Sequence, residues 1–236
     1  MLSPIFKFFD RAAAAPAQHM PLLQKTADSY NVYEVAKWRA AVQSARYFEK
    51  KLLTALQFGH RDELLAHAMQ LAPKTGLFLE FGVAGGESIR QIAAFHAGPV
   101  YGFDSFEGLP EDWFAYLRKG FFAQELPRTP DNVTLVKGWF SDTLDGFLAQ
   151  HDEPVAFLHI DSDLYSSADF VLRRLEPRLA PGAVVLFDEY WNYPGWLQHE
   201  FKAFREFIER TGLGYRYEGF VPTAHQVCVV LEERAA

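Results

Sequence analysis

The sequence has one cysteine, and this scarcity excludes several classes of site. Cys228 cannot form a disulfide within the chain, and without a CxxC pair there is no thiolate cage for a metal. Apart from His159, the histidines are scattered without the spacing of a zinc site. No GxSxG motif and no Cys/His pair stands out, so the residues do not support a nucleophilic hydrolase.

Two further absences concern location and partners. No apolar run is close to the length of about 20 residues that a membrane-spanning helix needs. The N-terminal stretch MLSPIFKFFDRAAAAPAQ is interrupted by Pro4, Lys7 and Asp10, where a signal peptide would stay apolar. The net charge of −7 argues against nucleic acid held by bulk electrostatics. We therefore expect a cytoplasmic protein without a nucleic-acid partner or stable membrane insertion; membrane attachment through an amphipathic N-terminus is the less favoured alternative.

The composition fits one α/β domain with a small appendage. The chain has 236 residues, of which 49% are hydrophobic, enough for a full core. Residues 32–71 space their apolar side chains at three and four, which predicts helices, including one over Glu34–Gln57 and one ending at Pro73. The run AAAAPA at Ala12–Ala17 reads as a linker. We predict a helical extension or lid over residues 1–72 and the main domain over residues 73–236.

From residue 77 onward, short apolar runs alternate with helical patterns. Alternation of this kind predicts a mostly parallel sheet covered by helices on both faces. The final two runs are joined by the short loop GFVPTAH, so they should pair antiparallel at an edge. The sequence thus predicts a doubly wound, Rossmann-like sheet of seven strands with a terminal β-hairpin. The expected strands are Leu77–Phe81, Val100–Asp104, Val133–Val136, Val155–Asp161, Ala183–Asp188, Tyr215–Phe220 and Gln226–Leu231.

A glycine-rich turn follows the first of these strands, in the stretch LFLEFGVAGGES. Glu80 ends the apolar run, and Asp104 lies 24 residues further on, at the end of the next strand. Ligands of doubly wound sheets bind at the carboxyl ends of the strands, and an acid about 20 residues beyond such a turn commonly holds a ribose diol. The alternative is a glycine cap and a surface carboxylate.

The turn does not have the GxGxxG spacing of a dinucleotide site. Glu87 falls in the first turn of the following helix, where its charge would repel a pyrophosphate. A ligand with a ribose and a cationic or zwitterionic end fits better, and S-adenosylmethionine is such a ligand. The glycine-rich turn, which has few side chains, would then leave space for this ligand.

Acidic residues also end the strands within HIDSDLY and LFDEY. Asp161, Asp188 and Glu189 should converge there, and like charges packed closely raise one another's pKa unless a cation neutralises them. Either one acid is a general base, or Mg²⁺ binds. Alternatively, Asp161 and Asp188 cap the following helices. His159 should share the face of Asp161, as a second polar group in the pocket or as a core histidine.

Six stretches in order resemble the macrocin O-methyltransferase family. They are EFGVAGGESI, YGFDSFEGLPEDW, VKGWFSDTL, LHIDSDLYSSADFVLRRL, PGAVVLFDEYWNYPGW and HQVCVV, and they cover about residues 77–231. Members of this family have the class I methyltransferase fold and use S-adenosylmethionine, mainly to methylate sugar hydroxyls in natural products. The resemblance implies the same fold, activity and cofactor here.

Site residues follow from the resemblance by position. It implies that Asp161 acts as the catalytic base, with His159 beside it. Relatives hold Mg²⁺ with the acid of HID and two consecutive aspartates, which correspond here to Asp161, Asp188 and Glu189. The implied cofactor-binding residues are Glu80, Gly82, Gly86 and Ser88 at the methionine end, Asp104 at the ribose, Ser105 and Phe106 along the nucleoside, Trp139, Phe140 and Asp142 near the adenine, and Asp161.

The acceptor is expected to be a small molecule that bears a hydroxyl group. The segments EDWFAYLRKGFF and YWNYPGW are candidates for its pocket wall, although such aromatic residues also pack between helices and sheets. The helical N-terminus would cover the site as a lid or form the surface of a homodimer. An NAD-dependent oxidoreductase, a catalytically inactive nucleoside-binding protein and an N-methyltransferase are the alternative functions.

Overall fold

The computed structural model describes residues 31–114 and 117–234. The predicted linker at residues 12–17 and the N-terminal stretch lie outside them, as does part of the segment EDWFAYLRKGFF. The helices are α3 (Val32–Lys51), α4 (Arg61–Leu71), α5 (Glu87–Phe95), α6 (Phe140–Leu148), α7 (Tyr165–Leu175) and α8 (Glu200–Thr211), with short 3₁₀ turns η1 (Glu176–Arg178) and η2 (Trp196–Gln198).

A single mixed sheet runs through the molecule in the order β1-β7-β8-β6-β5-β2-β3-β4. Its strands are β1 (Leu56–Gln57), β2 (Leu77–Phe81), β3 (Val100–Asp104), β4 (Val133–Lys137), β5 (Val155–Ile160), β6 (Val184–Phe187), β7 (Gly214–Phe220) and β8 (Val227–Glu232). Only the pairs that involve β8 are antiparallel, which confirms the predicted mostly parallel sheet with a terminal hairpin. The hairpin does not lie at the edge as expected, because β1 pairs with β7 and forms that edge.

The sheet has one strand more than the sequence predicts. We expected a helix to continue to Gln57, but α3 ends at Lys51 and Leu56–Gln57 forms β1, which pairs parallel with β7. The residues after Lys51 are good helix formers, so propensity favours continuation. Backbone pairing with Gly219 and Phe220 outweighs that preference. Each remaining strand boundary lies within one residue of its predicted position.

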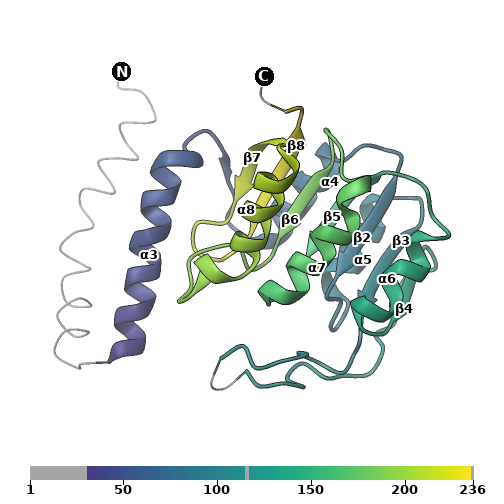
Figure 1. The fold of residues 1–236 in the computed structure, drawn as a ribbon, viewed down its shortest axis with the longest axis horizontal. Helices are drawn as coiled ribbons and strands as arrows, with labels where there is room; N and C mark the ends of the chain where they lie inside the picture. The colour runs from purple at the N-terminus through teal and green to yellow at the C-terminus, as the bar shows by residue number, and fades with distance from the viewer. Residues whose placement is uncertain (1–30, 115–116, 235–236) are drawn as a thin grey trace.

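Two layers of helices cover the sheet (Figure 1). In the view of Figure 1, α6, α7 and α8 lie in front of the strands, with α4 and α5 behind them. Each layer has its own buried core, because alternate side chains of a strand point to opposite faces. For example, Leu79 and Phe81 belong to the core beneath α6–α8, whereas Phe78 belongs to the core beneath α4 and α5.

Helix α3 stands at one end of the sheet in Figure 1. From Ala40 onward the helix carries Ala40, Ser44 and Tyr47, which are buried or pack against the core. In the first half, the side chains of Val32 and Trp38 are exposed. Among residues 31–114 and 117–234, no helix is both long and apolar enough to span a membrane.

Candidate cofactor and acceptor site

A cavity of about 670 Å³ opens at the carboxyl ends of β2, β3, β5 and β6. The parallel register brings these ends together, since Glu80 lies beside His159 and His159 lies beside Leu186. Most of the predicted site residues are part of the wall: Gly82, Ser88, Asp104, Ser105, Trp139, Phe140, Asp161, Asp188 and Glu189.

Five predicted site residues do not line the cavity: Glu80, Gly86, Phe106, Asp142 and His159. Glu80 is completely buried beneath the turn. Its Oε1 atom accepts a hydrogen bond from the Ser88 hydroxyl (2.5 Å) and lies 2.8 Å from His159 Nδ1. Because Ser88 does line the cavity, Glu80 acts on the site through its neighbours.

The glycines of the turn have separate roles. Gly82 has a φ of +91°, and a Cβ there would lie 1.7 Å from the carbonyl oxygen of Asp161. Gly86 is the N-cap of α5 with a φ of +77°, and a Cβ there would press on Arg90 and Pro127. Gly85, in contrast, lines the cavity and would give a Cβ only an ordinary contact. Close approach of the Asp161 backbone therefore explains Gly82, a positive φ together with the side chains of Arg90 and Pro127 explains Gly86, and open space toward a ligand fits Gly85.

Asp104 binds the same turn through its carboxylate. Its Oδ2 atom accepts the backbone N–H groups of Val83 and Ala84, both at 2.9 Å, and its Oδ1 atom accepts that of Phe106 at 2.7 Å. A carboxylate offers about four lone-pair positions, so about one remains, on Oδ1. Ser105 lies next to it, and its hydroxyl accepts the N–H of Glu107 while keeping its own hydrogen to donate.

Aromatic side chains form the wall beyond Asp104. Trp139 precedes the first residue of α6, and Phe140 packs edge-on against the buried ring of Phe81, with centroids 5.1 Å apart. The contact fixes Phe140 between the core and the cavity. Asp142 does not line the cavity, but it accepts a hydrogen bond from the hydroxyl of Ser141, which does.

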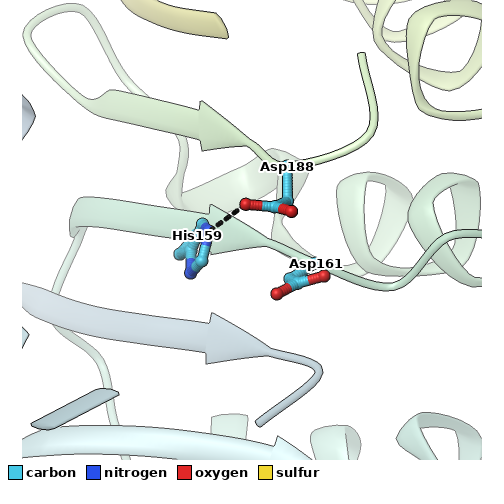
Figure 2. Close-up of side chains that lie close together, drawn as sticks. All are labelled: His159, Asp161 and Asp188. Carbon is cyan, nitrogen blue, oxygen red and sulfur yellow. Dashed lines mark ion pairs between the residues drawn. The ribbon is translucent and has the colours of Figure 1, made fainter. Parts of the chain in front are cut away.

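The other end of the cavity is an acidic cluster around His159 (Figure 2). Ligand atoms of His159, Asp161 and Asp188 all lie within 4.8 Å of one another, and His159 Nε2 is 3.9 Å from Asp188 Oδ1. Burial opposes protonation of His159, but hydrogen bonding and charge from Asp188 and Glu80 outweigh it and raise its pKa to about 10. The protonated form of His159 is therefore favoured, and the ring lies between the side chains of Glu80 and Asp188.

The two aspartates of this cluster differ in charge state. Burial and the nearby charge of Asp188 raise the pKa of Asp161 well above its usual range. Burial would also raise the pKa of Asp188, but His159, Arg61 and Gln226 favour its carboxylate and lower the pKa overall. Asp188 is thus the ionised member, and Asp161 is the member poised to take up a proton.

Glu189, the third predicted metal ligand, faces a different partner. Its Oε2 atom lies 2.8 Å from His225 Nδ1. Of the three predicted metal ligands, only Asp161 and Asp188 belong to the cluster with His159. Mg²⁺ is usually bound through one or two carboxylates together with water or substrate oxygens, so these two carboxylates fit the ion. His159 does not line the cavity, and its Nδ1 atom already lies 2.8 Å from Glu80 Oε1, so Asp161 and Asp188 are the members of the cluster that face the cavity.

Several residues of the site were not identified by the sequence analysis. Arg61 reaches the cavity from α4, and Asp163 lines it with a φ of +60°, a conformation that is uncommon outside glycine. Glu200 on α8 is fully buried, and its two oxygens accept the N–H groups of Ser162 (3.3 Å) and Glu189 (3.0 Å). Only the second aspartate of DSD could have been suspected from its position two residues after Asp161.

Part of the two aromatic segments that were predicted to form the acceptor wall lies at the cavity. Trp113 packs edge-on against Tyr193 and His199, with centroids 6.0 and 5.9 Å away. Phe122, whose φ is +71°, lines the cavity directly. The two aromatic segments therefore meet near the cavity, and one of them contributes to its wall.

Comparisons with known proteins find similar sequences and similar folds. The family described as a methyltransferase domain matches residues 79–190. A curated relative from Streptomyces olivaceus, 8-demethyl-8-(2,3-dimethoxy-alpha-L-rhamnosyl)-tetracenomycin-C 4'-O-methyltransferase, is 36% identical over 141 residues. That alignment covers 49% of this chain and 53% of the relative, so the chain matches about half the length of that protein.

Solved structures show the same fold. The calicheamicin methyltransferase CalS11 superposes with a TM-score of 0.57 at 23% identity, covering 72% of this chain and 76% of that one. The O-methyltransferase NovP gives a TM-score of 0.55 at 22% identity, covering 74% and 80%. These findings confirm the family resemblance seen in the sequence. Residues 79–190 of this chain match a methyltransferase domain, and the described residues have the fold of class I methyltransferases.

Proposed function

We propose that this protein transfers a methyl group from S-adenosylmethionine to a hydroxyl of a small molecule, and that the acceptor is a sugar. The observation that carries the proposal is one cavity joining the glycine turn and Asp104 to the acids Asp161 and Asp188. The match to a methyltransferase domain supports the cofactor, and the name of the Streptomyces relative, which specifies a rhamnosyl substrate, supports a sugar acceptor. Nothing in these matches favours an oxidoreductase.

The cofactor would lie along the cavity in one direction. Its ribose would meet Oδ1 of Asp104 and the Ser105 hydroxyl, its adenine would lie near Trp139 and Phe140, and its methionine end would follow the turn from Gly82 to Ser88. This direction brings the sulfonium toward the acidic end of the cavity. Fixed carboxylates there favour a cationic centre electrostatically.

The reaction is a single displacement. The acceptor oxygen attacks the methyl carbon in line with the sulfur, a C–O bond forms, the C–S bond breaks, and S-adenosylhomocysteine leaves as a neutral thioether. The hydroxyl proton passes to the Asp161 carboxylate, which lines the cavity; in the absence of a bound cation, burial and the charge of Asp188 raise the pKa of this carboxyl group. Positioning by the cavity wall would supply much of the remaining acceleration. His159 would act from beneath by holding the acids in place.

We further propose that Mg²⁺ binds through Asp161 and Asp188, with Glu189 as a third ligand if it releases His225. A bound Mg²⁺ would make the acceptor hydroxyl more acidic and orient it. Asp161, Asp188 and Glu189 would supply the carboxylate oxygens. Glu200 holds the loops that carry them, because it accepts the backbone N–H groups of Ser162 and Glu189.

The division at residue 72 is also a proposal. Helix α4 precedes it and yet packs on the core of α5, through buried Leu64 and Leu65, and Arg61 lines the cavity. These contacts support a direct role of the extension in covering the site. The exposed Val32 and Trp38 of α3 support a homodimer surface as its other role.

Calorimetric titration with S-adenosylhomocysteine, run once with Mg²⁺ and once with EDTA, tests the proposed function. We expect micromolar binding under both conditions, because the residues assigned to the nucleoside lie apart from the metal ligands. A glycoside panel, assayed for methyl transfer, then identifies the acceptor. Absence of binding under both conditions would contradict the proposal.

A further inference from the structure

The charges that line the cavity are strongly unbalanced. Six carboxylates face it: Glu87, Asp104, Asp161, Asp163, Asp188 and Glu189. Among the lining residues that the structure describes, Arg61 is the only lysine or arginine. The acids can receive an ammonium or sulfonium, but the amino-acid end of S-adenosylmethionine is zwitterionic and also carries a carboxylate. That carboxylate needs a cation or a set of N–H donors.

Arg61 has the position that this carboxylate requires. It is the first residue of α4, and its guanidinium lies between the start of α5 and the end of β6, 3.7 Å from Glu87 Oε2 and 3.9 Å from Asp188 Oδ2. The proposed path of the methionine end, from Gly82 to Ser88, leads to the same place. Trp139 and Phe140 line the nucleoside end of the same cavity.

The guanidinium also retains donors for a ligand. Its contacts with Asp62, Glu87 and Asp188 are 3.7–4.0 Å long, beyond hydrogen-bond distance. Arginine has five N–H donors in a planar fork, which matches a carboxylate in a bidentate way. The side chain is 37% exposed, so it can reorient without disturbing a core.

We infer that Arg61 binds the carboxylate of the cofactor's methionine end, which makes α4 part of the cofactor site. This inference rests on the proposed function. It assigns to the segment before residue 77 a binding role that the sequence motifs do not indicate. The competing role for Arg61 is to balance the charges of Glu87 and Asp188 without contact with the cofactor.

A binding cycle separates the two roles without any acceptor. Wild type and Arg61→Ala are each titrated with S-adenosylhomocysteine and with its decarboxylated analogue, which keeps the adenosine, thioether and amine. We expect the wild type to prefer the carboxylate-bearing ligand by about 10- to 100-fold, the range of a hydrogen-bonded charge, and Arg61→Ala to lose that preference. Arg61→Lys should keep part of it.

Arg210→Ala is the matched control, because Arg210 pairs with Glu176 away from the cavity. Its preference between the ligands should equal that of the wild type. An unchanged preference in Arg61→Ala, or no preference in the wild type, would overturn the inference while leaving the proposed function in place. Failure of the wild type to bind S-adenosylhomocysteine would instead contradict the proposed function and, with it, this inference.

Discussion

Asp104 is the last residue of β3, and Asp161 is the first residue after β5. Both line the cavity, but their surroundings differ. The Asp104 carboxylate accepts three backbone N–H groups and so forms part of the turn it faces. For Asp161, the described residues show no hydrogen bond to the carboxylate, and burial with the charge of Asp188 raises its pKa. One acid is already satisfied by the protein, whereas the other is left for a proton, a metal or a substrate.

This contrast separates structural from chemical roles within one site. A carboxylate saturated by backbone donors shapes a binding loop, and its removal should affect binding and stability. A carboxylate without donors in a cavity is open to a proton, a metal ion or a ligand, so we expect Asp161 to act in catalysis or ligand binding. Three substitutions test the contrast.

Asp161→Asn should have the largest effect. The amide keeps the size of the side chain but cannot accept the acceptor's proton, and we expect kcat to fall by about 10²- to 10⁴-fold, the usual contribution of a general base. The affinity for S-adenosylhomocysteine, measured by calorimetry, should not decrease. Wild-type kcat in this variant would remove Asp161 as base and as metal ligand.

Glu200→Gln should have an intermediate effect. The buried carboxylate accepts N–H groups from the two loops that follow β5 and β6, and an amide can accept only one of them well. We expect kcat to fall by about 10- to 100-fold, as for other residues that orient catalytic groups, and Mg²⁺ affinity to weaken. Amide hydrogen exchange at Ser162 and Glu189 should become faster.

Glu206→Gln on the same helix is the control for this change. Glu206 accepts a hydrogen bond from the Tyr165 hydroxyl at a part-buried position and does not line the cavity. If both variants lose the same amount of activity, general destabilisation of α8 is the cause, and a positioning role for Glu200 is excluded.

Asp104→Ala should have the smallest effect on turnover at saturating cofactor. We expect the affinity for S-adenosylhomocysteine to fall by about 10-fold or more, because the ribose contact and the turn geometry are lost together. The free energy of unfolding should fall by about 1–3 kcal/mol, since three N–H groups lose their acceptor. Unchanged affinity in calorimetry, with an altered melting temperature, would show a purely structural carboxylate.

The sequence predicts the sheet well because its signals are local. β2 and β3 have their predicted bounds, since each is a short apolar run that ends at glycine or acid. The acids at the strand ends are predictable for the same reason, because parallel topology places those ends along one edge. The end of α3 is not predictable locally, since it depends on pairing between Leu56–Gln57 and the distant β7.

The partners of the site residues are less predictable. Glu80 reads as a cofactor ligand because it ends a strand before a glycine turn, yet its neighbours Ser88 and His159 enclose it completely. Arg61 and Glu200 lie on helices without a recognisable sequence motif. Only the three-dimensional packing brings Arg61 to the cavity and Glu200 to the loops beside it. Spacing along the chain indicates which strand end a residue occupies, but it does not indicate which distant side chain meets it.

A crystal structure of the complex with S-adenosylhomocysteine tests the central claim most directly. The account predicts the ribose within hydrogen-bond distance of Asp104 Oδ1 or the Ser105 hydroxyl, the adenine beside Trp139 and Phe140, and the sulfur facing Asp161. A ligand bound in the opposite direction, with its adenine among Asp161, Asp163 and Asp188, or bound outside this cavity, would contradict it.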